Sequence, residues 1–356
     1  MSLKVESVIL GPETDQYAGR GQEAQSPSSI AEASRRAERM GFDVLNTPEG
    51  GHDPFLPLGL AAEHTNSIRL GTNVAIAFPR SPMATAQVAW DLQHLSGGRF
   101  QLGLGTQVKG HIKRRYATPW TGAPGPRLKE YVQCLQAMFK TFQNPDNPTY
   151  FEGEHYQYTL MSPFFNPGPI EHPEIPIYLA AVNTYNARVC GELCAGLRAH
   201  PVASFAYSRD VLMPAIEEGA RKSGRMIEDI DIVGSPFLAL GADEEGVEQA
   251  KEALKQQVSF YASTRSYHSV LKYHGWDDLG PRLHELSLQG KWTELPKQIT
   301  DEMLEEWAIV ASYDEFPAKL RERAKGAYTS VLLDLPGALK ADEDRVADIV
   351  RQLHES

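Results

Sequence analysis

Short apolar runs alternate with longer segments whose apolar residues recur every three to four positions along most of the chain. The short runs have the length and composition of strands, and the longer segments have the periodicity of amphipathic helices. Regular alternation of this kind is typical of repeated β-α-β units and predicts a parallel sheet. The predicted strands are residues 4–10, 43–47, 68–76, 100–105, 176–182, 196–201, 230–240 and 328–335.

Helical segments follow these strands in turn, and the sequence around several of them supplies the expected end signals. Ser28 and Ser29 can cap the first helix and Gly41 can end it, while Ser81 with Pro82 opens the third. Eight strands, each paired with a helix, predict an α/β fold of the (β/α)8 TIM-barrel type. The predicted helices are residues 27–40, 53–66, 82–98, 127–142, 185–194, 209–222, 244–261, 313–326 and 342–354.

Two long segments interrupt the alternation. The loop at 143–176 is rich in Pro, Asn and aromatic residues and is far longer than an ordinary connection, which is typical of a lid or a functional loop. The segment at 261–296 is dense in aromatic residues, Gly and His and is interpreted as an insertion before the last strand. We therefore expect one barrel domain at 1–335 followed by a helical tail at 336–356. The aromatic residues of both segments suggest an apolar organic substrate.

Composition narrows the class of protein. Of 356 residues, 42% are hydrophobic and 23% are charged, as in an ordinary globular protein with a sizeable core. The net charge of −11 opposes binding to nucleic acid or anionic lipid, and no apolar run is long enough to cross a bilayer. The N-terminus lacks the pattern of a signal peptide, so we expect a cytoplasmic protein with reduced thiols. Cys134, Cys190 and Cys194 are accordingly expected as small buried hydrophobes, and no metal is expected.

Candidate chemistry should lie at the carboxyl ends of the strands, because the loops of a parallel barrel converge there. After the second strand, the run PEGGHDPF places Glu49, His52 and Asp53 together among glycines. The alternative is that Asp53 caps the next helix and Glu49 forms a salt bridge at the rim. For Asp53 we favour the cap.

Two further strand ends carry weaker signals. The fourth strand ends in LGLGTQVKGH, where a G-x-G pattern alone is weak evidence and Lys109 and His111 are only candidates. After the fifth strand, the amides of Val182, Asn183 and Thr184 could bind a phosphate at a helix N-terminus. An ordinary Asn or Thr cap explains the same residues equally well.

Taken together, these segments resemble the luciferase-like monooxygenase superfamily, and specifically its F420-dependent oxidoreductase branch. The most specific part is the run IRLGTNVAIAFPRSPMATAQVAWDLQHLSGGRFQLGLG at 68–105. The runs at 41–65 and 161–182 and the closing helix-and-strand pattern at 313–333 support it. The resemblance covers nearly the whole barrel and implies a bacterial-luciferase-like fold.

The resemblance also implies a cofactor site. The peptide between Asn73 and Val74 matches the place where relatives carry a cis peptide bulge behind the central ring of the cofactor, so Val74 would be the backstop. The loop after the fourth strand matches the part that contacts the ring edge, and the turn after the fifth strand matches the part that receives the phosphate. The cofactor-binding residues expected on this basis are Asn73, Val74, Gly105, Thr106, Gln107, Val108, His111, Ala181, Val182 and Asn183.

By resemblance, the enzyme would transfer a hydride between coenzyme F420 and an apolar organic substrate. Some deazaflavin dehydrogenases have a His next to an Asp where this chain has Pro48 and Glu49. A general acid or base is still needed, since hydride transfer creates or consumes a proton. The candidates are Glu49, which is favoured because it aligns with the family's His position, and His52, which would reach in from further along the loop. Lys109, His111 and Arg188 could offset the charge of the cofactor's phosphate or oligoglutamate.

Two alternatives have the same fold. One is an FMN-dependent monooxygenase, in which reduced flavin binds oxygen inside a dry pocket. The other is a barrel that binds flavin without turnover, for which a mouth without titratable groups would be expected. The expected partners are a small-molecule substrate and a second copy of the chain in a homodimer, with neither nucleic acid nor membrane.

Overall fold

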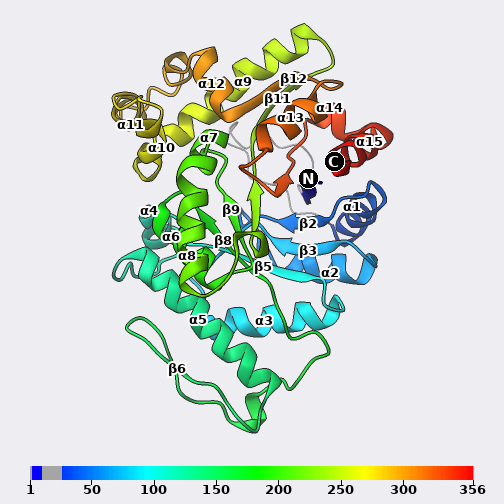
Figure 1. Ribbon diagram of the computed structural model, residues 1–356, viewed down its shortest axis with the longest axis vertical. Coiled ribbons are helices and arrows are strands. Elements are labelled where there is room, and N and C mark those ends of the chain that lie inside the picture. Colours follow the sequence, from blue (N-terminus) through cyan, green and yellow to red (C-terminus); the bar gives the residue numbers. More distant parts are fainter. Residues whose placement is uncertain (1, 10–25, 356) are drawn as a thin grey trace.

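Eight parallel strands close into a barrel in the computed structural model, which describes residues 2–9 and 26–355 (Figure 1). Around the barrel the strand order is β3-β2-β1-β13-β10-β9-β8-β5, and the pairing of β3 with β5 closes the ring. The predicted (β/α)8 barrel is therefore confirmed. Its strands are β1 (Lys4–Val8), β2 (Val44–Thr47), β3 (Arg69–Thr72), β5 (Phe100–Gly105), β8 (Ile177–Ala181), β9 (Gly196–Ala199), β10 (Asp231–Gly234) and β13 (Ser330–Leu332).

Each of these strands lies inside a segment predicted from the sequence, with two qualifications. Leu10, the last residue of the first predicted strand, lies outside the described residues. The third predicted strand, at 68–76, is divided in two, because two residues separate the end of β3 at Thr72 from the start of β4 (Ala75–Ile76). β4 continues the same edge of the barrel, since it pairs with the end of β5 through Ala75 and Ile76.

Helices surround the barrel close to their predicted places. The second helix begins at Leu56 instead of 53, because the carboxylate of Asp53 accepts the amide hydrogens of Phe55 and Leu56 ahead of the first turn. The predicted helix at 209–222 is preceded by a short turn and starts with a wider π-helical segment, Ser208–Leu212. The helices are α1 (Pro27–Arg39), α2 (Leu56–His64), α3 (Pro82–Leu95), α5 (Pro124–Gln143), α6 (Thr184–Leu193), α7 (Phe205–Tyr207), α8 (Met213–Lys222), α13 (Phe316–Ala324) and α15 (Glu343–His354), with the unpredicted α4 (Lys109–Arg114) and α14 (Gly337–Lys340).

The barrel interior is polar at its centre. Arg198 on β9 donates to Glu6 on β1 at 2.6 Å and to Asn46 on β2 at 2.9 Å, and Asn46 donates to Glu6 at 2.8 Å. All three side chains are buried, so the ion pair compensates charges that burial would otherwise penalise strongly. A Cβ at Gly103 would lie 2.0 Å from the Thr72 carbonyl oxygen and 3.0 Å from Nε of Arg198, which explains why a glycine lies here.

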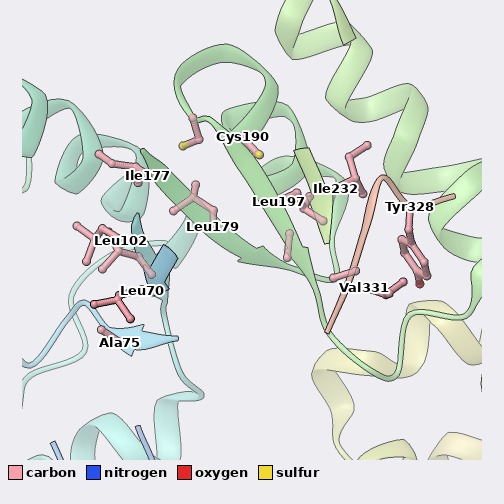
Figure 2. Packing of buried hydrophobic residues seen from close by; sticks show 14 of the residues in the cluster. Leu70, Ala75, Leu102, Ile177, Leu179, Cys190, Leu197, Ile232, Tyr328 and Val331 are labelled. Carbon is pink, nitrogen blue, oxygen red and sulfur yellow. The ribbon is translucent and has the colours of Figure 1, made fainter. Parts of the chain in front are cut away.

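The outer faces of the strands are apolar and pack against the helices. Figure 2 shows Leu102, Leu179 and Leu197 from three strands that are neighbours in the barrel, with Cys190 of α6 beside them. Cys134, Cys190 and Cys194 are all buried and free, which confirms that they serve as small hydrophobes. Alternating polar inside and apolar outside follows from the two-residue repeat of a strand.

The seventh predicted strand, at 230–240, is wrong as a single element. β10 ends at Gly234, and β11 (Phe237–Gly241) leaves the barrel to pair in parallel with β12 (Ala308–Ser312), a strand that was not predicted. Pro236 lies between them and has no amide hydrogen to donate to a ladder, so the apolar run cannot continue as one strand.

A second hydrophobic core forms around β11 and β12, at one end of the molecule's long axis (Figure 1). Phe237, Val258, Leu283, Leu304 and Trp307 are among its buried side chains. The segment predicted as an insertion, 261–296, supplies part of this core and is mostly helical. The helices of this region are α9 (Glu244–Ala262), α10 (His268–Tyr273), α11 (Leu279–Leu288) and α12 (Asp301–Trp307).

The long loop at 143–176 connects a helix to the following strand and therefore starts away from the barrel mouth. It folds back as a small hairpin of β6 (Phe151–Glu152) and β7 (Gln157–Tyr158) that lies along α5. Glu130 on α5 accepts the amide hydrogens of Glu154, His155 and Tyr156 at the tip of this hairpin. The hairpin thus reaches the N-terminal part of α5, which is the end nearest the mouth.

Candidate functional site

The residues that follow the strands lie together at the mouth of the barrel. Because side chains alternate along a strand, residues two positions apart share a face, and Gly103 and Arg198 mark the inner face of their strands. On the same face and nearer the mouth come Gly105 at the end of β5 and His200 just after β9. These positions surround the end of the barrel where a ligand would enter.

The predicted cis peptide bond between Asn73 and Val74 is present. It lies in the gap between β3 and β4, so Val74 is displaced from the regular ladder. A Cβ added at Gly105 would lie 2.7 Å from Cγ2 of Val74. Only a glycine at 105 therefore lets the Val74 side chain lie against the end of β5.

Glu49 is a buried carboxylate with three hydrogen-bond donors around it. It accepts the Ile76 amide hydrogen at 2.6 Å, the Arg80 guanidinium at 2.7 Å and the Tyr116 hydroxyl at 2.9 Å. Its side chain is only 5% exposed. Glu49 thus ties the loop after β2 to β4, immediately beyond the cis peptide, and to the segment after α4.

These contacts shift the pKa values of the two side chains that face Glu49, Arg80 and Tyr116. Burial alone would lower the pKa of Arg80, but the hydrogen bonds and charges of Glu49 and Asp53 raise that pKa above its ordinary value. Burial and then the Glu49 carboxylate raise the pKa of Tyr116 to about 12, so its phenol is neutral at ordinary pH. Glu49 therefore forms the salt bridge that the sequence offered as the alternative to a catalytic role. Its partner Arg80 is mostly buried and does not lie at the exposed rim.

Asp53 and His52 lie on the same loop and are exposed. Asp53 accepts the amide hydrogens of Phe55 and Leu56 at 2.8 and 3.2 Å. The N-cap residue of α2 is nevertheless Phe55, so Asp53 orders the turn before the helix and is not its cap as predicted. Its second oxygen pairs with Arg80 at 3.1 Å. Whether His52 acts as an acid or base stays a prediction.

The loop after β5 has an unusual backbone. Gln107 has a φ of 56°, in the left-handed region that non-glycine residues rarely adopt, and its own side chain accepts the Val108 amide hydrogen at 2.9 Å. Thr106 and Val108 flank it and are half-buried, and α4 then presents Lys109 and His111 on the surface. Burial, followed by Arg115 and Arg114, lowers the pKa of His111, so this side chain is not a strong cation near neutral pH.

The turn after β8 shows the ordinary cap expected as one alternative. The Asn183 side chain accepts the Asn186 amide hydrogen at 2.9 Å and begins α6. The amides of Thr184 and Tyr185 form no hydrogen bond within the described residues. The same turn therefore retains donors for an anion, since the first amides of a helix have no partner inside it.

Arg127 is a candidate residue that sequence reasoning placed only as the start of a helix. Its side chain is 9% exposed and stacks 4.2 Å from the ring centre of Phe78, which follows β4. Nε donates to the Tyr156 hydroxyl at 2.9 Å, but Nη1 has no partner, and no carboxylate of the described residues pairs with Arg127. A buried cation without a counterion suits an anionic ligand. An arginine in the first turn, where the helix dipole disfavours a cation, was the available signal.

The comparisons with known proteins agree with this geometry. The family model for luciferase-like monooxygenases matches residues 8–330. The chain belongs to the luciferase-like monooxygenase family. An uncharacterized protein of Mycobacterium tuberculosis is 42% identical over 309 residues, which cover 86% of this luciferase-like chain and 90% of the relative.

Named relatives are more distant. A 5,10-methylenetetrahydromethanopterin reductase of Methanopyrus kandleri is 25% identical over 341 residues, covering 92% of this chain and 93% of the relative. The solved structure of a coenzyme F420 dependent tetrahydromethanopterin reductase from Methanopyrus kandleri matches with a TM-score of 0.76 at 22% identity, covering 98% of this chain and 97% of that one. At this identity the structural match shows the shared luciferase-like barrel.

Two further findings concern membrane-spanning helices and metal sites in this luciferase-like chain. Among residues 2–9 and 26–355, every helix is too short or too polar to span a membrane. In the same part of the chain, no three His, Cys, Asp or Glu side chains gather in a way that could hold a metal ion.

His200 completes the mouth on the side of β9, where the second core packs. Its ring lies 4.5 Å from that of Tyr267 and 5.0 Å from that of Tyr261, measured between ring centres. Burial lowers the pKa of His200 from 6.5 to about 4, so the imidazole of this luciferase-like barrel is neutral near pH 7.

This low pKa predicts a pH dependence of stability. Between pH 6.5 and about 4 the unfolded chain protonates His200 while the folded chain does not, so the stability present above pH 6.5 is lost as the pH falls. The loss approaches about 3 kcal/mol at the lower pH. In urea unfolding, His200→Gln should lose less stability than the native chain between about pH 7 and about pH 5. His268 and His274, whose pKa values are also lowered, remain in both proteins. Parallel stability curves for the two proteins would contradict the assignment.

Proposed function

We propose that this luciferase-like chain is an F420-dependent oxidoreductase that transfers a hydride between the deazaflavin and an apolar organic substrate. Two observations together carry the proposal: the Val74 side chain lies against Gly105 at the mouth, and Nη1 of Arg127, whose guanidinium stacks on Phe78 after β4, has no hydrogen-bond partner. A putative coenzyme F420-dependent oxidoreductase of Mycobacterium tuberculosis, which is 28% identical over 82% of this chain, supports F420 as the cofactor.

The residues present fit such a cofactor. A deazaflavin has a flat ring that needs a close-packed apolar support, and Val74 against Gly105 offers one. It also carries a phosphate and an acidic tail, for which Arg127 and the amides of Thr184 and Tyr185 are available donors. Phe78 connects the ring support to the phosphate donors, because it follows β4 and its ring stacks on the Arg127 guanidinium.

When bound, the deazaflavin supplies a carbon that gives or takes a hydride, and the protein positions the reactants and manages the proton. Glu49 holds β4 through the Ile76 amide, and its oxygens already accept three hydrogen bonds. His52 is exposed on the same loop, where exchange of a proton with solvent is direct. These contacts favour His52 for proton exchange and Glu49 for positioning the backstop.

Cofactor titration tests the proposal. The purified protein should bind F420 more tightly than FMN, measured by fluorescence titration of each cofactor. Arg127→Met should weaken F420 binding by about tenfold or more, since a charge-assisted hydrogen bond to the phosphate is lost. Arg351→Met on α15 is the matched control, because Arg351 is an exposed arginine that pairs with Asp348 and Glu355, and its effect should be within about twofold. Tighter binding of FMN would support the monooxygenase alternative, which the family description also names.

Kinetics of the variants at 49 and 52 separate acid-base chemistry from positioning. If either group moves the proton, His52→Asn or Glu49→Gln should lower kcat about 10²-fold while cofactor binding is retained. If Glu49 only positions β4, Glu49→Gln should instead weaken F420 binding and lower stability, because Arg80 loses its buried partner. The measurements are steady-state turnover, cofactor titration and urea unfolding of each variant. Near-native kcat in both variants would contradict an acid-base role for the loop after β2.

A further inference from the structure

His200 and Tyr267 link the barrel mouth to the segment after α9. Arg198 points into the barrel, so the alternation along β9 places His200 on the same inner side, one step nearer the mouth. Tyr267 comes from the segment between α9 and α10, far away in the sequence. Nε2 of His200 lies 3.1 Å from the Tyr267 hydroxyl. The pair is separated from the Val74 bulge by β8 and β5 in the strand order.

The hydrogen bonds of His200 determine which nitrogen carries its proton. Nδ1 accepts the Val202 amide hydrogen at 3.2 Å and therefore has no proton of its own. Burial keeps the imidazole neutral near pH 7, since its pKa is lowered to about 4. A neutral imidazole with a bare Nδ1 carries its hydrogen on Nε2, so His200 donates and the Tyr267 oxygen accepts.

The hydroxyl hydrogen of Tyr267 is then left to donate elsewhere. Burial and then Tyr261 raise the pKa of Tyr267 to about 12, so the phenol keeps this hydrogen. Within the described residues, the only hydrogen bond of the Tyr267 hydroxyl is the one with His200. A half-buried phenol with its oxygen already occupied is a directed donor for one further acceptor.

Neighbouring contacts fix the segment around Tyr267 to the residues after β9. The Tyr207 hydroxyl donates to the Val182 carbonyl at 3.0 Å, in the turn after β8 that is predicted to bind the cofactor. The Ser204 hydroxyl lies 2.8 Å from Nε2 of His274 at the end of α10. The Tyr207 hydroxyl also lies 3.5 Å from the Ser269 hydroxyl, so the segment that carries Tyr267 is fixed to the residues after β9, and Tyr207 in turn joins those residues to the turn after β8.

We propose that Tyr267, oriented by His200, is a specificity-determining residue that donates a hydrogen bond to an oxygen atom of the substrate. The substrate class is then an apolar compound with a carbonyl group, or the corresponding alcohol. Aromatic walls from Tyr261 and Tyr267 would contact its carbon skeleton, and the hydroxyl of Tyr267 would orient its oxygen. This inference rests on the proposed function for its assignment of the ligand as substrate, but the binding it predicts can be measured without turnover.

The test compares ligands that differ only in the oxygen atom. Cyclohexanone is paired with methylenecyclohexane, and acetophenone with α-methylstyrene. Their affinities are measured by ligand-observed NMR titration, with and without F420. The native protein should bind at least one ketone about fivefold more tightly than its hydrocarbon partner, which is the size expected for one hydrogen bond. Tyr267→Phe should remove this difference while retaining the ring.

Tyr261→Phe is the matched control, because the Tyr261 ring packs edge-on against the same imidazole but its hydroxyl does not bond to it. It should keep the preference for the ketone. If Tyr267→Phe fails to fold, His200→Phe, which retains a ring but cannot orient the hydroxyl, should reduce the preference. The proposal is overturned if no ketone binds more tightly than its partner, or if the preference survives in the variants at 267 and 200. Failure of F420 to bind would instead count against the proposed function and would leave the ketone comparison intact.

Discussion

The buried carboxylate of Glu49 is the contact on which the arrangement of the mouth depends. Parallel strands bring their carboxyl ends together, but they do not determine the path of the chain beyond those ends. Glu49 does so for three segments at once, through the Ile76 amide, Arg80 and the Tyr116 hydroxyl. Because a buried carboxylate is costly without such partners, its contacts must all form together, and they hold β4 beside β5. The Val74 bulge is consequently held against Gly105.

The opposite side of the mouth is organised by a different principle. After β10 the chain leaves the barrel at Pro236 and builds a second core, and the segment between α9 and α10 returns to cover the loop after β9. Tyr267 and His274 of that region form hydrogen bonds with His200 and Ser204 after β9. A segment that is distant in sequence is thereby attached to the strand ends. In the proposed function, the ends of β4 and β5 would hold the cofactor, and the segment between α9 and α10 would distinguish substrates.

Much of the fold could be predicted because it depends on local periodicity. The eight barrel strands follow from apolar runs, and the hydrogen bonds of Asp53 to the turn before α2 follow from its place ahead of a helix. The family resemblance supplied the cis peptide at Asn73, which no periodicity indicates. The departure of β11 from the barrel was missed because an apolar run looks the same in either sheet. His200 follows a predicted strand end, but its contact with Tyr267 and the role of Arg127 could not be found, since they depend on contacts between distant segments and on atoms left without partners.

A crystal structure of the complex with F420 tests the central claim most directly, namely that the mouth formed by the Val74 bulge and Arg127 holds the deazaflavin. The account predicts that the ring lies against Val74 and that a phosphate oxygen lies about 3 Å from Nη1 of Arg127. A ring bound elsewhere, or a phosphate that leaves Arg127 without an anionic partner, would contradict it.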